Sequence, residues 1–257
     1  RYGDGLFETI KFKNKEFILL ENHLERLWEG MHLLQFDKPK LFTKQYLADE
    51  LANLVNKNKD NSARIRLTVF RAEGGLYDAV HHHPQFIIQS LPLLTDTEIL
   101  NSNGLQVCIY KDALKSCDAF SNIKHNNYLP YFMGALFAQA NHCNDAIILN
   151  NHLRICDSTI ANIFILKNEI IYTPSLSEGC VAGVMRKFLI DQIPALGFEL
   201  KEMSITEEML LDADELFLSN SIYNIKWVAS VPGKDYKNII TRKLFDSLQQ
   251  TNKNVFC

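Results

Sequence analysis

The sequence has no excess of basic residues and no long apolar run. Its 257 residues carry 27 lysines and arginines against 30 aspartates and glutamates, a net charge of −3. Without a basic excess to meet a phosphate backbone, we expect no nucleic-acid partner. No apolar stretch approaches the roughly 20 residues that a membrane-spanning helix needs, so we expect no membrane partner either.

Cysteine pairs and metal-ligand spacings are also missing. The six cysteines form no C-x-x-C pair and no disulfide-like framework, which predicts free thiols in a reducing cytoplasm. The run His81-His82-His83 is a poor metal site, because consecutive residues rarely turn their rings toward one ion. A solvated loop is the simpler explanation, and we predict no metal.

The composition is that of a globular protein, with 47% hydrophobic and 22% charged residues. The length suffices for one large domain or two modest ones. Residues 92–104 are rich in Pro, Thr, Asp, Asn and Ser, which is typical of a linker. We therefore predict a domain over 1–93, a linker over 94–103 and a second domain over 104–257. The chain opens on Arg1-Tyr2-Gly3 inside a motif, and we expect an N-terminal segment to be missing.

Hydrophobic periodicity predicts a mixed α/β chain. In the first domain it indicates strands, helices and strands in the order β-β-α-α-β-β, an α+β pattern, over residues 6–12, 17–20, 24–34, 41–58, 63–70 and 85–91. In the second domain it predicts strands over 105–110, 146–150, 153–156, 162–166, 170–173 and 215–218. Helices are expected there over 129–140, 184–193 and 242–250.

Three features suggest chemistry, each with a simpler alternative. Lys124 lies in SNIKHNNYL without an acidic neighbour, and is either an exposed lysine or a nucleophile whose environment lowers its pKa. The glycines of GCVAGVMRKFL precede a predicted helix, whose N-terminus could bind an anion such as phosphate. They could equally serve a tight turn, and the P-loop pattern is absent.

Other charged residues are ambiguous by themselves. Arg26, in HLERL, has the position of a solvated arginine opposite the apolar stripe of its helix. Arg64 and Arg66 share one face of a strand, where exposure is again the simpler explanation. Asp157 follows a predicted strand and begins DSTIAN, where an aspartate is ordinary turn chemistry.

Six motifs in order resemble the class IV aminotransferases, the fold-type IV enzymes that depend on pyridoxal 5′-phosphate. This family includes branched-chain aminotransferases, D-amino-acid aminotransferases and aminodeoxychorismate lyases. The motifs are RYGDGLFET (1–9), HLERL (23–27), KHNNYL (124–129), DSTIANIF (157–164), TPSLSEGCVAGVMR (173–186) and DELFLSNS (214–221). The resemblance implies a small α+β domain followed by a larger cofactor-binding domain with a β-barrel-like core flanked by helices.

The resemblance also implies residue roles for the cofactor. Lys124 would form a Schiff base with the cofactor's aldehyde and then move a proton. The phosphate would be bound by Arg26, by the backbone N–H groups of Val184 and Met185 and by the hydroxyl of Ser221.

Two further cofactor contacts follow from the same resemblance. Tyr128 would hydrogen-bond the cofactor's phenolic oxygen, as in some members of the family. Asp157 takes the place of a glutamate that usually faces the pyridine nitrogen and keeps it protonated. Aspartate keeps the charge but shortens the arm by roughly 1.5 Å.

For the substrate, the resemblance implies that Phe7 forms a pocket wall and that Arg66 binds a carboxylate. A solvated Arg66 is an equal alternative. The loop 72–84 would overhang the site.

Three functions remain open at this stage. The leading hypothesis is an aminotransferase that moves an amino group between an amino acid and a 2-keto acid. The second is an aminodeoxychorismate lyase that releases pyruvate and 4-aminobenzoate, although the strand 84–90 lacks the arginine expected for a second carboxylate. The third is a catalytically silent member that acts as a binding module. The resemblance further implies a homodimer.

Overall fold

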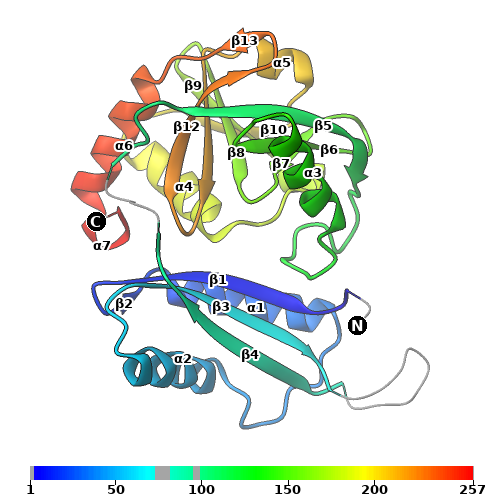
Figure 1. Cartoon of the computed structure of the whole chain (residues 1–257), viewed down its shortest axis with the longest axis vertical. Helices are drawn as coiled ribbons and strands as arrows, with labels where there is room; N and C mark the ends of the chain where they lie inside the picture. Colours follow the sequence, from blue (N-terminus) through cyan, green and yellow to red (C-terminus); the bar gives the residue numbers. More distant parts are fainter. Residues whose placement is uncertain (1–2, 73–81, 95–98, 257) are drawn as a thin grey trace. The chain divides into compact units, whose positions relative to one another are not determined.

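The structure, a computed structural model, describes residues 3–72, 82–94 and 99–256 (Figure 1). Arg1 and Tyr2 of the opening motif, most of the loop 72–84 with His81, part of the linker 94–103 and Cys257 lie outside the described residues. The chain forms two compact units, one of Arg1–Thr95 with Ile123–Asn127 and one of Asp96–Asn122 with Tyr128–Cys257. The short segment around Lys124 therefore packs with the N-terminal residues.

The first unit is a four-stranded antiparallel sheet with two helices, in the predicted order. The strand order is β2-β1-β3-β4. The elements are β1 (Leu6–Lys13), β2 (Glu16–Phe17), α1 (Leu20–Leu33), α2 (Lys44–Asn58), β3 (Ala63–Arg71) and β4 (Pro84–Leu91). The helix α2 begins after Thr43, whose hydroxyl accepts a hydrogen bond from the Tyr46 N–H.

Strict alternation along β1 decides what each face of this sheet carries. Leu6 and Ile10 pack with residues of α1 and α2, so that both helices cover one face (Figure 1). The opposite face carries Phe7 and, from the neighbouring strand β3, Arg66. Glu8 shares the helix-covered face with Leu6 and Ile10, which places a carboxylate in an otherwise apolar row.

The second unit is built on a nine-stranded mixed sheet. Its strands are β5 (Leu105–Lys115), β6 (Asp145–Asn150), β7 (Ile155–Ser158), β8 (Asn162–Lys167), β9 (Ile170–Pro174), β10 (Leu200–Met203), β11 (Glu215–Asn220), β12 (Asn224–Val231) and β13 (Lys234–Asp235). Its helices are α3 (Leu129–Ala140), the 3-10 helix η1 (Leu176–Glu178), α4 (Val184–Ala195), α5 (Glu207–Asp212), α6 (Ile239–Thr251) and α7 (Lys253–Phe256).

This sheet curls into a half-barrel. Its order is β10-β9-β8-β11-β12-β5-β6-β7, with β13 paired to β12. The helix α3 packs on β5 and β6, while α4 and α6 pack on β11 (Figure 1). Buried aliphatic residues such as Ile147, Ile163 and Leu216 form the core. The expected mixed α/β fold with a barrel-like second part is thereby confirmed.

Several element boundaries differ from those predicted from the sequence, because strands continue through polar residues. The strand β5 continues past Tyr110, where the predicted strand ends, to Lys115, and this extension carries Lys111, Asp112 and Lys115. The strand β7 includes Asp157, which is buried rather than placed in an exposed turn. Burial of a charged residue needs tertiary partners, which sequence periodicity does not reveal.

Candidate active site

Lys124 lies along the edge of β1. The N–H of Phe7 donates to the Lys124 carbonyl at 3.0 Å, and the N–H of Asn126 donates to the Gly5 carbonyl at 2.7 Å. The Lys124 ammonium lies 4.6 Å from the centre of the Phe7 ring, and the side chain is half-buried. This lysine is therefore fixed by backbone pairing and desolvated on one side by an aromatic ring.

The two predicted substrate residues lie beside Lys124. Arg66 extends from β3 across the same face of the sheet, and its guanidinium carbon lies 4.1 Å from the centre of the Phe7 ring. Phe7 is thus contacted by both cations, from Lys124 and from Arg66, in a cation–π arrangement. The first unit brings together a predicted nucleophile, a predicted apolar wall and a predicted carboxylate-binding arginine.

Arg26 forms an ion pair and does not have the solvated position that its sequence context suggested. Its guanidinium forms a bidentate ion pair with Glu8, through Nε to Oε1 at 2.8 Å and Nη2 to Oε2 at 2.5 Å. The ring of His23 donates from Nδ1 to the same carboxylate at 2.6 Å. Both Glu8 and His23 are completely enclosed. His23 was not predicted as a functional residue; the signal for it is its three-residue spacing from Arg26, which places both side chains on one face of a helix.

Folding lowers the pKa of both Glu8 and His23, but for different reasons. Burial alone would raise the pKa of Glu8, but the Arg26 guanidinium and the His23 hydrogen bond outweigh it and lower the pKa from 4.5 to about 2. Burial lowers the pKa of His23 and, together with the cations Arg26 and Lys124, outweighs the hydrogen-bonded Glu8 carboxylate, which acts in the opposite direction. The histidine is therefore neutral and donates to the carboxylate.

The lowered pKa of Glu8 predicts an acid-sensitive contribution to stability. A carboxyl whose pKa is depressed on folding stabilises the fold above its ordinary pKa and loses this contribution as the pH falls through the folded value. Relative to Glu8→Gln, the wild type should lose about 3 kcal/mol of unfolding free energy between about pH 4.5 and about pH 2. Denaturant unfolding over this range measures it, with the exposed Glu16→Gln as control. A constant difference between the wild type and Glu8→Gln would contradict the assignment.

In the second unit, Asp157 is the centre of a buried polar cluster. Its Oδ2 accepts hydrogen bonds from the Tyr131 hydroxyl at 2.8 Å and from the Val181 N–H at 2.9 Å. The Lys115 ammonium lies 3.3 Å from the same oxygen. The Asn162 amide donates to Oδ1 at 2.8 Å. The carboxylate is thus surrounded by donors and held in one orientation.

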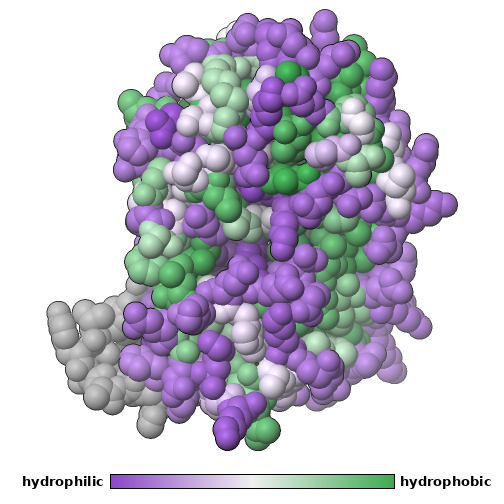
Figure 2. All heavy atoms as spheres, turned by 180° about the vertical axis from the view of Figure 1, so that it is seen from behind, coloured by the Kyte–Doolittle hydropathy of each residue, from purple (hydrophilic) through white to green (hydrophobic). Residues whose placement is uncertain are grey.

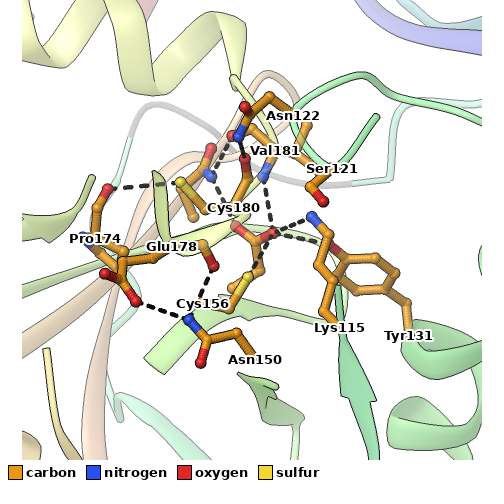
Figure 3. Close-up of polar contacts among 12 residues, drawn as sticks. Lys115, Ser121, Asn122, Tyr131, Asn150, Cys156, Pro174, Glu178, Cys180 and Val181 are labelled. Carbon is orange, nitrogen blue, oxygen red and sulfur yellow. Dashed lines mark hydrogen bonds and ion pairs between the residues drawn. The ribbon is translucent and has the colours of Figure 1, made fainter. Parts of the chain in front are cut away.

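Lys115 and Tyr131 were not identified from the sequence. Lys115 ends β5 with a side chain that is only 6% exposed, and its ammonium also lies 5.2 Å from the centre of the Tyr131 ring (Figure 3). Burial and the Asp157 charge raise the pKa of Tyr131 well above its usual value, so its hydroxyl remains a donor. Neither residue belongs to a spacing pattern, since both reach Asp157 only through the fold.

The start of α4 lies next to this cluster. Val184 and Met185 are the first two helical residues, both are buried, and no side chain caps this end at Gly183. The first N–H groups of a helix have no intrahelical acceptor, which makes this end suited to an anion. Asn162 connects the two features, since its amide donates to both Asp157 and the Val181 carbonyl.

Glycine is required at position 183 because the Asn162 side chain approaches it closely, whereas its backbone conformation does not require glycine. A Cβ atom at this position would overlap the side-chain oxygen of Asn162. We expect Gly183→Ala to displace Asn162 from Asp157 and to destabilise the fold by about 1–3 kcal/mol. Thermal or denaturant unfolding measures the loss. The double variant Gly183→Ala with Asn162→Ala should cost less than the sum of the two single changes, and strict additivity would contradict the overlap.

The remaining predicted residues border the same region. Ser221 lies in the turn after β11, two residues beyond Ser219, which pairs with Asn162 in the sheet register. The Ser219 hydroxyl is buried and has no partner among the described residues. Tyr128 stacks on Tyr131 with ring centres 4.3 Å apart and donates to the Thr159 carbonyl at 3.1 Å.

A second buried carboxylate supports the loop that leads into α4. Glu178 accepts a hydrogen bond from Asn150 at 2.7 Å (Figure 3). It also accepts from Ser204 at 2.6 Å and pairs with Arg154 at 2.5 Å. The Asn122 amide donates to two carbonyls of the same loop. These contacts fix the backbone two residues before Lys124 and just before the α4 N-terminus.

The described part of the histidine tract has local partners. The His82 ring meets Arg71 at 3.0 Å, and the His83 ring meets the Asp37 carbonyl at 2.9 Å.

Within residues 3–72, 82–94 and 99–256, no group of three histidine, cysteine or acidic side chains is arranged to hold a metal ion. In the same ranges, no helix is both long and apolar enough to cross a bilayer. The face in Figure 2 is covered mainly by hydrophilic residues, with hydrophobic ones between them.

The second unit carries groups that suit pyridoxal 5′-phosphate. The uncapped N–H groups of Val184 and Met185 suit a phosphate, and the buried Ser219 hydroxyl lacks a hydrogen-bond partner among the described residues. The Asp157 carboxylate suits a protonated ring nitrogen. Among the described residues, Asn162 alone is seen to donate to Oδ1, so this oxygen keeps capacity for another donor. The residues present therefore fit this cofactor.

The sequence matches the amino-transferase class IV family over residues 5–231, well over half of its length. The chain therefore belongs to the class IV aminotransferase family. Enzymes of this family depend on pyridoxal 5′-phosphate. The family predicted from the six motifs is confirmed.

Relatives with different activities are similar to this chain. Aminodeoxychorismate lyase of Vibrio harveyi is 28% identical over 239 residues, covering 92% of this chain and 86% of that protein. D-alanine aminotransferase of Bacillus licheniformis is 26% identical over 271 residues, covering 99% and 92%. The crystal structure of a branched-chain aminotransferase from Thermoproteus uzoniensis with norvaline superposes with a TM-score of 0.86 at 25% identity, covering 97% and 85%. The family thus includes both transferase and lyase relatives.

Proposed function

We propose that this chain is a pyridoxal 5′-phosphate-dependent aminotransferase that moves an amino group between an amino acid and a 2-keto acid. The observation that supports it most is in the second unit, where a buried carboxylate and an uncapped helix start share one partner, Asn162. When bound, this cofactor supplies an aldehyde that carries the amino group and a ring that accepts electrons.

Each residue of the second unit has a defined task in this proposal. The N–H groups of Val184 and Met185 and the Ser221 hydroxyl bind the phosphate. Asp157 binds the ring nitrogen, and its four donors prevent it from rotating away. Tyr128, which is stacked on Tyr131, is the proposed donor to the phenolic oxygen, and its hydroxyl hydrogen would turn from the Thr159 carbonyl to make this bond.

The residues of the first unit are assigned to covalent attachment and substrate. Lys124 would hold the cofactor through its side-chain nitrogen and, once the substrate amine has displaced it, would take the proton from the substrate α-carbon. The Phe7 ring, whose centre lies 4.6 Å from the Lys124 nitrogen, holds this side chain beside the proposed pocket wall. Phe7 and Arg66 bind the apolar part and the carboxylate of the substrate. Arg26, oriented by Glu8, is the proposed guanidinium for the phosphate.

A turnover assay tests the proposal. The purified protein with pyridoxal 5′-phosphate is given an amino donor with and without a 2-keto acid, and the new keto acid is quantified. An aminotransferase forms it catalytically only when the acceptor is present. Formation limited to one equivalent per site with every acceptor tried would argue against transfer as the main reaction.

Aminodeoxychorismate lyase is the second candidate function. The observation that favours it is the similarity to the Vibrio harveyi enzyme of that name over 92% of this chain. Against it, β4 carries no arginine for a second carboxylate. The same assay discriminates, because a lyase releases pyruvate from aminodeoxychorismate without any keto acid. A binding module without activity would give neither reaction.

We also propose a homodimer, as the family resemblance implies. Support comes from α3, whose outer side exposes Leu129, Phe132, Met133 and Leu136 at helical spacing and which contains no charged residue. Two copies of this uncharged face could meet without burying a charge. The cytoplasmic location stays a prediction.

Self-association through α3 is testable by substitution. We expect Leu136→Glu to convert a dimer into a monomer in light scattering, because it would place a charge in an apolar contact. The control is Leu41→Glu, at another exposed leucine. A monomeric wild type would contradict the homodimer, and a dimeric Leu136→Glu would contradict the assignment to α3.

A further inference from the structure

The buried pair of Lys115 and Asp157 has a consequence for the cofactor. The two side chains are 6% and 3% exposed, and the ammonium lies 3.3 Å from Oδ2. The other donors to this carboxylate are neutral: the Tyr131 hydroxyl, the Val181 N–H and the Asn162 amide. Lys115 is thus the cation that balances the Asp157 charge within the described part of the chain.

The thiols near this pair add no compensating charge. Cys156 lies 3.9 Å from Oδ2, and burial raises the pKa of its thiol well above the usual value. Cys180 lies in the loop before α4, and burial raises the pKa of its thiol to about 12. Both remain neutral, so the carboxylate and the ammonium together carry no net charge.

A neutralised carboxylate holds a second cation less strongly than a free one. A protonated ring nitrogen at Asp157 would be attracted by the carboxylate and repelled by the Lys115 ammonium, and charges act strongly in a buried site. We propose that Lys115 is a positioning residue that acts through Asp157 and limits how far this carboxylate protonates the cofactor's ring nitrogen. The inference rests on the proposed function and assigns a role to a lysine outside the family motifs.

An electrostatic role and a structural role of Lys115 predict different effects on the binding of cofactor analogues. If Lys115 only supported the fold around Asp157, its loss would weaken binding of every cofactor analogue alike. If it opposes the ring charge, its loss favours a ring that can be protonated over one that cannot. The informative quantity is therefore a ratio of dissociation constants, not activity.

The experiment compares pyridoxal 5′-phosphate with its carbocyclic analogue, in which a C–H group replaces the ring nitrogen. The dissociation constants of both are measured by equilibrium dialysis for the wild type, Lys115→Met, Lys115→Gln and Lys115→Arg. Lys115→Gln keeps a donor toward Asp157 and so protects the fold, while Lys115→Arg keeps the charge. Lys111→Met, at an exposed lysine on the same strand, is the matched control.

We expect the preference for pyridoxal 5′-phosphate over the analogue to rise about tenfold in Lys115→Met and Lys115→Gln, because a unit charge is removed from beside the carboxylate. It should stay at the wild-type ratio in Lys115→Arg and Lys111→Met. A ratio within twofold of the wild type in both neutral variants overturns the inference alone. A wild type that binds neither compound overturns the proposed function, and the inference with it.

Discussion

Lys124→Ala is expected to reduce turnover by about 10⁴-fold, the largest functional effect of any single change in this chain. The side chain is the proposed point of covalent attachment and the proposed base, so that two tasks are lost at once. Phe7 and the backbone pairing with β1 remain, and the fold should be kept. Steady-state formation of keto acid, with circular dichroism to check folding, measures both points.

The control for this variant is Lys111→Ala, which removes an exposed lysine that pairs with Glu207 at the surface. It should retain wild-type turnover, because exposed ion pairs contribute little. Wild-type turnover in Lys124→Ala would mean that another group is the nucleophile, and the assignment of the lysine motif would be wrong.

Asp157→Ala is expected to give the largest loss of stability, about 3–5 kcal/mol in the free energy of unfolding. It leaves the Lys115 ammonium buried without its carboxylate, and it deprives Tyr131, Val181 and Asn162 of an acceptor. Denaturant unfolding of the protein without added cofactor measures this loss separately from cofactor binding.

Two further variants complete the test. Asp112→Ala removes an exposed aspartate from the same strand as Lys115 and should change stability little. The double variant Asp157→Ala with Lys115→Met removes both buried charges and should be more stable than Asp157→Ala alone. If Lys115→Met destabilised the Asp157→Ala variant further instead of stabilising it, the unpaired Lys115 charge would not explain the destabilisation by Asp157→Ala.

The fold and the family were predictable because their signals are local. Alternation along β1 and β3, the apolar stripes of α1 and α2 and the glycines before α4 each lie within one short segment. On the face of the first unit's sheet opposite its helices, Phe7 and Arg66 lie beside Lys124, and the roles assigned to these three residues stay predictions.

The contacts that tune these residues could not be predicted, because they join distant segments. Glu8 was one residue of the opening motif, yet it binds His23 and Arg26 from α1. Lys115 seemed to lie beyond the end of a strand, yet it neutralises Asp157, which is 42 positions further along the chain. Buried charged residues do not recur at a regular spacing in the sequence, and their partners can be identified only in the folded structure.

Lys124 is the proposed point of attachment of pyridoxal 5′-phosphate. The most direct test is the absorption spectrum of the purified protein after incubation with this cofactor, followed by borohydride reduction and mass mapping of the modified lysine. We predict a yellow protein whose reduction fixes the cofactor on Lys124, with no labelling of Lys115. A colourless protein without a modified lysine, or a label on another residue, would contradict the account.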